Sequence, residues 1–96
     1  MTHLEMKREE EGGRHSPFSE NYRPHLVAAG SEDYLAVTVV NLPEDRAVAP
    51  GSSAYIEFDL DYHPRVDYSA LAVGSSFEIR EGGRVVGTGE VTAMID

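Results

Sequence analysis

The chain has 96 residues, enough for one domain with a thin core, and 41% of them are hydrophobic. It has no cysteine, which excludes disulfides and cysteine-based metal sites, and no apolar run approaches the roughly 20 residues of a membrane span. Its formal net charge of −9 repels polyanions at long range and disfavours general nucleic-acid binding.

The first ten residues contain no apolar stretch and do not resemble a signal peptide. We therefore expect a cytoplasmic protein that does not associate with membranes. The chain starts with Met1 and reaches a strand pattern at once, from which we expect a complete, free-standing domain.

Strand patterns begin close to the N-terminus. Short runs predict strands at Leu4–Arg8 and Pro24–Ala28, with the glycine turn Glu11–Arg14 between them. The next run, Leu35–Val40, is rich in β-branched side chains and predicts a strand that is buried on both faces or nearly so.

The clearest alternation runs from residue 54 to residue 63. Its apolar face holds Ala54, Ile56, Phe58, Leu60 and Tyr62, and its polar face holds Tyr55, Glu57, Asp59, Asp61 and His63. This period of two predicts a half-buried strand whose other face is acidic and solvated. A solvated strand face is also the simplest interpretation of its three carboxylates.

The last third of the chain alternates turns with short strands. Asp67–Val73 has room for one helical turn, and Phe77–Arg80 predicts a strand that Gly82-Gly83 connects to the next one as a hairpin. One face of that final strand is predicted to hold Val85, Gly87, Gly89, Val91, Ala93 and Ile95. Glycines inside a strand indicate a sharp bend or a close backbone approach, as at a barrel corner.

These short strands, with turns between them and no convincing helical stripe, predict an all-β fold, a small antiparallel barrel. Closure of the barrel would remove the exposed sheet edges that make small β domains aggregate. The tetrapeptide Glu-Gly-Gly-Arg occurs at 11–14 and again at 81–84, and we interpret both copies as turns.

Three longer motifs go beyond periodicity: Glu10–Phe18 followed by Asn21–Pro24, then Val48–Gly51, then Phe77–Gly89. In this order and at nearly these separations they resemble the third, C-terminal domain of translation elongation factor Tu, over about residues 4–95. The resemblance implies a six-stranded antiparallel β-barrel. It also implies contacts with a GTPase domain, with the T-stem of aminoacyl-tRNA and with a nucleotide-exchange factor.

The resemblance assigns roles to individual residues. Those implied to contact RNA are Arg14, His15, Arg80, Glu81 and Gly82. Those implied to dock on a neighbouring protein domain are Tyr22, Arg23 and Pro24. Glycine turns let a backbone approach a sugar–phosphate chain closely, and arginines beside them can contact phosphate without reading sequence.

The chain departs from the family pattern at several points. Ser19 stands where an aromatic residue is usual, and the stretch from His63 to Gly74 is longer by several residues. A lysine of the family that contacts tRNA has no clear counterpart, His63 being the nearest candidate. No Gly-x-x-x-x-Gly-Lys-Ser/Thr loop is present, because Thr88 follows Gly87 where the lysine is needed, so we expect no GTP binding by this chain.

Simpler explanations compete with the RNA assignment. Arg14 and Arg80 can pair with carboxylates such as Glu11 and Glu81, and at a net charge of −9 this pairing ranks slightly ahead of phosphate contact. The four histidines lack the spacing of a metal site, and nothing assembles a nucleophile with a base, so we expect no metal, no cofactor and no catalysis.

The sequence thus predicts a non-catalytic binding module that docks on aminoacyl-tRNA or on a translation-factor protein. A protein-interaction module that has lost RNA binding, or a subunit of a split translation factor, are the alternatives. An apolar patch left exposed in the absence of neighbouring domains would favour self-association.

Overall fold

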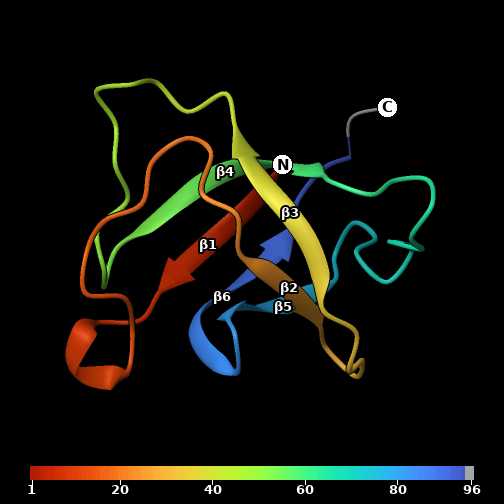
Figure 1. Cartoon of the computed structure of the whole chain (residues 1–96), viewed down its shortest axis with the longest axis horizontal. Helices are drawn as coiled ribbons and strands as arrows, with labels where there is room; N and C mark the ends of the chain where they lie inside the picture. Colours follow the sequence, from red (N-terminus) through yellow and green to blue (C-terminus); the bar gives the residue numbers. More distant parts are fainter. Residues whose placement is uncertain (95–96) are drawn as a thin grey trace.

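The computed structural model of the chain describes residues 1–94. The strands are β1 (Thr2–Met6), β2 (His25–Ala28), β3 (Leu35–Val40), β4 (Ser53–Leu60), β5 (Ser76–Glu81) and β6 (Arg84–Val91). Every neighbouring pair is antiparallel, and the strands close a barrel in the order β1-β4-β3-β2-β5-β6 (Figure 1). The prediction of a small six-stranded antiparallel β-barrel is confirmed.

Helical structure is minimal among residues 1–94. One 3-10 helix, η1 (Glu9–Glu11), ends at Gly12, whose φ of 92° lies in the left-handed region. Within 67–73 the Leu71 N–H donates to the Tyr68 carbonyl, which closes a single turn that does not continue into a helix, and Tyr68 and Leu71 are buried in the core. No described helix has the length and apolarity to cross a membrane.

The core fills the barrel interior with the inward-facing residues of the strands. Its largest fully buried side chains are Leu4, Leu26, Val37, Val39, Ile79 and Val86. Loop residues close the two ends: Phe18 and Val48 bridge at one end, and Tyr68 and Leu71 pack at the other. In β3 the inner face is fully buried and the outer face half-buried, so the expected burial is complete on one side only.

The alternation of residues 54–63 predicts a longer strand than the structure contains. β4 ends at Leu60, and the Asp61 N–H makes one further bond to β3, to the Ala36 carbonyl, before the chain turns. Tyr62, predicted to face the core, is 52% exposed. The side-chain pattern continued past the strand because a tyrosine is as compatible with a wet barrel rim as with a core.

A β-bulge changes which residues of β6 face the core, so the prediction for this strand is wrong at Val85. Ile79 pairs with Gly87 but Arg80 pairs with Val85, so Val86 is the extra residue. The bulge turns Val86 into the core and leaves Val85 half-buried, the reverse of the prediction. Ala93 lies beyond β6 and is exposed, and Ile95 lies outside the described residues.

The glycines of β6 do mark a close approach. A Cβ on Gly89 would lie 2.6 Å from the Phe77 ring, and one on Gly87 would lie 2.9 Å from the Glu5 carbonyl oxygen. Both distances are too short for any side chain, so strands β1, β5 and β6 pack together only because these positions carry none.

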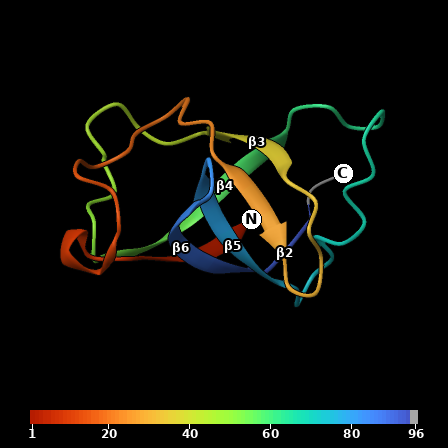
Figure 2. The same cartoon turned by 60° about the horizontal axis from the view of Figure 1, so that its bottom comes forward.

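The loops gather at two opposite ends of the barrel (Figure 2). The glycine-loop end carries residues 7–24, residues 41–52 and the β5–β6 turn, and Phe18 and Val48 join the first two of these through backbone hydrogen bonds. The distal end carries residues 29–34, residues 61–75, and Met1, whose carbonyl accepts from the Thr92 N–H.

Candidate functional site

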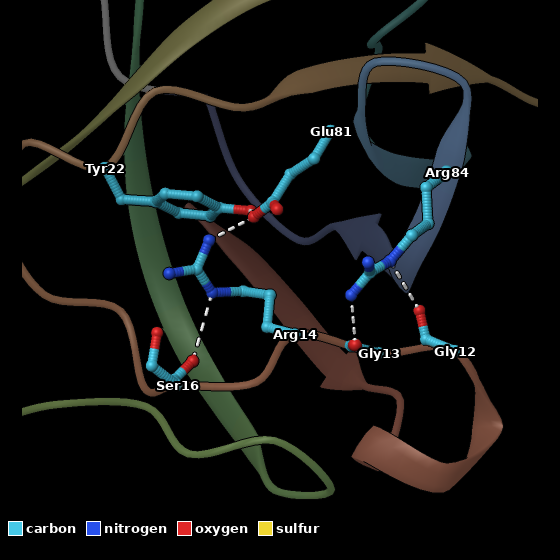
Figure 3. A network of polar contacts seen from close by, with 7 residues as sticks. All are labelled: Gly12, Gly13, Arg14, Ser16, Tyr22, Glu81 and Arg84. Carbon is cyan, nitrogen blue, oxygen red and sulfur yellow. Dashed lines mark hydrogen bonds and ion pairs between the residues drawn. The ribbon is translucent and has the colours of Figure 1, made fainter.

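A cluster of Arg14, Tyr22 and Glu81 lies at the glycine-loop end (Figure 3). The Arg14 guanidinium pairs with the Glu81 carboxylate and lies 4.4 Å from the centroid of the Tyr22 ring. The Tyr22 hydroxyl donates to the same Glu81 oxygen at 2.5 Å, and the Tyr22 ring stacks on Phe18 with 4.7 Å between centroids. The cluster is therefore fixed to the core through Phe18.

Arg14 has little freedom within this cluster. Its Nε donates to the Ser16 carbonyl at 3.1 Å, and only 19% of its side chain is exposed. The guanidinium is thus already oriented, and it is already engaged by a carboxylate. An external anion that binds Arg14 has to share it with Glu81 or displace Glu81.

The network shifts the pKa values of its members. Burial alone raises the pKa of Glu81, but hydrogen bonds from Tyr22 and Arg14 and the positive charge of Arg14 outweigh burial, and the pKa falls below its ordinary 4.5. Burial, followed by the hydrogen bond to Glu81, raises the pKa of the Tyr22 hydroxyl. At neutral pH Glu81 is therefore ionised and Tyr22 is a neutral donor.

Arg84 ties the second glycine turn to the first. Its Nε donates to the Gly12 carbonyl at 2.9 Å and its Nη2 donates to the Gly13 carbonyl (Figure 3). Gly13 is packed so closely that a Cβ there would lie 2.3 Å from the Lys7 carbonyl oxygen. Sequence reasoning did not single out Arg84 as a site residue, and its one signal was the repeated tetrapeptide.

The two Glu-Gly-Gly-Arg copies therefore interlock. The arginine of the first copy, Arg14, binds the glutamate of the second, Glu81, while Arg84 of the second binds the Gly12 and Gly13 carbonyls of the first. Two loops separated by about seventy residues become one continuous surface through these contacts.

Arg80 does not join this cluster. Its guanidinium donates to Glu78 Oε1 at 2.5 and 3.1 Å and to the Tyr34 hydroxyl at 2.8 Å, on the outer face of β5. Both candidate arginines thus pair within the molecule. Glu11 is not one of the partners, because its carboxylate accepts from the Arg8 N–H at 3.0 Å.

The other predicted residues take different positions. His15 is exposed, with Nδ1 2.6 Å from Glu9 Oε2, and Gly82 is exposed in the turn with a φ of 61°. Arg23 reaches Asp61 at 3.3 Å, and Pro24 is buried. Tyr22 is thus the one predicted protein-docking residue that shares a cluster with predicted RNA-binding residues.

Charge is unevenly distributed between this surface and the rest of the chain. Residues 7–15 and 81–84 contain four basic and four acidic residues, so the net charge of −9 belongs entirely to the remaining residues. Residues 7–15 and 81–84 consequently repel an anion less than the rest of the chain does. Within residues 1–94, no three His, Asp or Glu side chains are grouped to hold a metal ion.

One comparison with known proteins bears on this surface. The family model described as the elongation factor Tu C-terminal domain matches residues 3–95. The match spans nearly the whole chain and includes both interlocked turns.

Proposed function

Since the chain belongs to the family of elongation factor Tu C-terminal domains, we propose that it is a non-catalytic binding module of translation that docks on aminoacyl-tRNA through its glycine-loop end. It acts in the cytoplasm and binds no GTP through these residues. The observation that carries the proposal is the single surface made by the two interlocked turns, which presents glycine backbone and arginine side chains together.

The fold of the hairpin does not require a glycine at position 83. The hairpin needs glycine at position 82, where φ is 61°, but the φ of Gly83 lies outside the left-handed region. A Cβ on Gly83 would meet no atom within 4 Å. A partner that approaches the backbone closely is one reason to keep glycine there.

The chemistry of the surface suits a sugar–phosphate chain. Arg14 presents planar donors to phosphate oxygens, Glu81 accepts from a 2′-hydroxyl, and both are characteristic of shape-based RNA contacts. Phosphate exchanges with Glu81 at Arg14 at modest cost, because a partly exposed ion pair contributes only about 0–1 kcal/mol.

The test is fluorescence anisotropy of labelled aminoacyl-tRNA titrated with the purified protein at low and at physiological salt. We expect saturable binding that weakens with salt and is lost in Arg14→Ala/Arg80→Ala. Gly83→Ala separates docking from folding, since it should weaken binding about tenfold while the melting temperature stays unchanged. Arg65→Ala, which removes an exposed positive charge at the distal end, is the matched control.

Absence of binding even at low salt would rule out the proposal that this chain binds RNA. The second candidate is then a protein-docking module that has lost RNA binding, or a subunit of a split translation factor. Two observations favour this candidate: Arg14 and Arg80 are both engaged by glutamates, and the chain as a whole is acidic. Calorimetric titration with a separately produced elongation factor Tu GTPase domain tests it, with Tyr22→Ala as the variant expected to bind less.

A further inference from the structure

A pocket of about 540 Å³ is lined by residues of β4, the 61–75 loop and residues near Met1 and Met94, and by none of the residues of the interlocked turns. Apolar side chains from β4, from the 61–75 loop and from the C-terminal residues line one part of it, Phe58, Leu60, Leu71 and Met94 among them. A second hollow of about 470 Å³ shares Leu60, His63 and Met94 with the first and continues beside Val66. We call the two together the distal groove.

Part of the apolar lining faces solvent. Met94 is 52% exposed and Val66 is 39% exposed, although both side chains are apolar. A concave surface with solvent-facing apolar side chains is typical of a site that receives an apolar group.

The rim of the groove is acidic and only partly neutralised. Asp61 accepts from Arg23 at 3.3 Å and from the Thr38 hydroxyl at 2.6 Å. Glu57 accepts from the neutral Asn41 amide at 2.8 Å, and within residues 1–94 the Asp59 side chain forms no hydrogen bond or ion pair. Among the described residues, the carboxylates of Glu57 and Asp59 therefore have no cationic partner, while two positive groups, the Arg65 side chain and the Met1 ammonium, line other parts of the groove.

We propose that the distal groove binds a basic, amphipathic segment of a partner protein. An apolar side chain of the segment enters the pocket between Phe58, Leu60 and Leu71, and its Lys or Arg residues pair with Glu57 and Asp59. Charge decides between occupants: RNA and an anionic membrane are repelled by this rim, and a second copy of the chain would bring −9 against −9. The proposal is independent of the docking surface at the glycine-loop end.

The test is an NMR titration of the 15N-labelled protein with a peptide of about 14 residues in which leucine and lysine follow a helical spacing. We expect backbone shifts confined to residues 57–71 and 91–94. A peptide with glutamate in place of each lysine should not bind, and one with serine in place of each leucine should bind much more weakly. Shifts centred on residues 7–18 and 81–84, or equal binding of the glutamate peptide, would overturn the proposal.

Charge variants test whether the carboxylates at the rim of the distal groove are responsible for peptide binding. Glu57→Gln/Asp59→Asn should weaken the leucine–lysine peptide about tenfold at low salt. Glu44→Gln/Asp45→Asn, which removes the same two charges from an exposed loop at the glycine-loop end, should leave the affinity unchanged. Equal weakening by both double variants would reduce the binding to net charge and overturn a defined site.

Sedimentation of the protein alone supplies the remaining outcome. A monomer across the titration concentrations supports a groove open to a partner. Self-association that shifts the same residues would assign the groove to a second copy instead and overturn the proposal.

Discussion

Arg14 and Arg84 perform the same task in opposite directions, each binding the turn to which the other belongs. The repeated tetrapeptide is visible in the sequence; its second copy forms the predicted β5–β6 turn, whereas its first copy begins with the last residue of η1. The sequence could not show that the copies meet, because the loops are far apart in the chain and only closure of the barrel places them together.

The Arg14–Glu81 pair makes a prediction about acid stability. The pKa of Glu81 is lowered in the folded protein, so its contribution is present above its ordinary pKa of about 4.5 and is lost as the pH falls through the lowered value. Glu81→Gln should be less stable than the parent by about 1 kcal/mol or less at neutral pH, since the pair is partly exposed.

Thermal unfolding followed by circular dichroism from about pH 6 down to about pH 2 checks this linkage. The difference between Glu81→Gln and the parent should shrink as the pH falls. Glu44→Gln removes an exposed carboxylate that is not part of the cluster and serves as the control. A difference that stays constant across the range would show that ionised Glu81 is not the stabilising species.

The two glycines of the β5–β6 turn should respond differently to alanine. At Gly82 the φ of 61° forces a side chain into the left-handed region, which should cost about 1–2 kcal/mol. At Gly83 neither φ nor space opposes a Cβ, and the change should lie within about 0.5 kcal/mol of neutral. Urea unfolding of the two variants measures the contrast, and equal destabilisation would contradict it.

At the level of elements, the strands were easier to predict than their exact ends and faces. Period-two patterns located β3 and β4, and turn residues located the β5–β6 hairpin. The face of Val85 was missed because a bulge adds one residue without any change in composition that marks it. Tyr62 was missed because tyrosine suits both a core and a rim.

The sequence named some residues of the cluster but not its geometry, and it did not name Arg84. The motif resemblance named Arg14, Tyr22 and Glu81, which the structure brings together. It also named Arg80, whose side chain lies on the outer face of β5, away from this cluster. Side-chain pairing among so many carboxylates depends on barrel register, and no local pattern encodes that register.

The bulge in β6 can be tested by two matched substitutions. Val86→Thr places a hydroxyl in the barrel interior, where an unsatisfied polar group should cost about 1–3 kcal/mol. Val85→Thr places the same group on the half-buried outer face, and the change should stay within about 0.5 kcal/mol. Urea unfolding curves compare the two, and a larger loss from Val85→Thr would place the bulge elsewhere.

At the scale of the whole molecule, the longest extent is 33 Å, and the carboxylates of the distal groove belong to other elements than the interlocked turns. Screening should therefore decide whether they influence each other, because the Debye length is about 8 Å at physiological salt and about 30 Å at 0.01 M. Charges at the distal groove should affect binding of an anion at the glycine-loop end only when the salt concentration is low.

The double variant Glu57→Gln/Asp59→Asn measures this coupling. It should tighten the binding of aminoacyl-tRNA at low salt, because it removes two negative charges, and should leave that binding unchanged at physiological salt. Anisotropy titrations at both salt concentrations check the expectation. A change of equal size at both would require a structural link between the ends.

Strand β1 pairs with β4 and β6, so Thr2 lies beside Ile56 and Val91. Within this domain β1 is therefore synthesised before both of its partners, and β6 is the last of the six strands to be made. Closing such long loops costs entropy before any contact is gained, which places barrels of this kind among the domains that fold in about milliseconds to seconds. During that interval β1 is an open strand edge, and it is the strand of this domain that stays exposed to aggregation while both of its partners are still to be made.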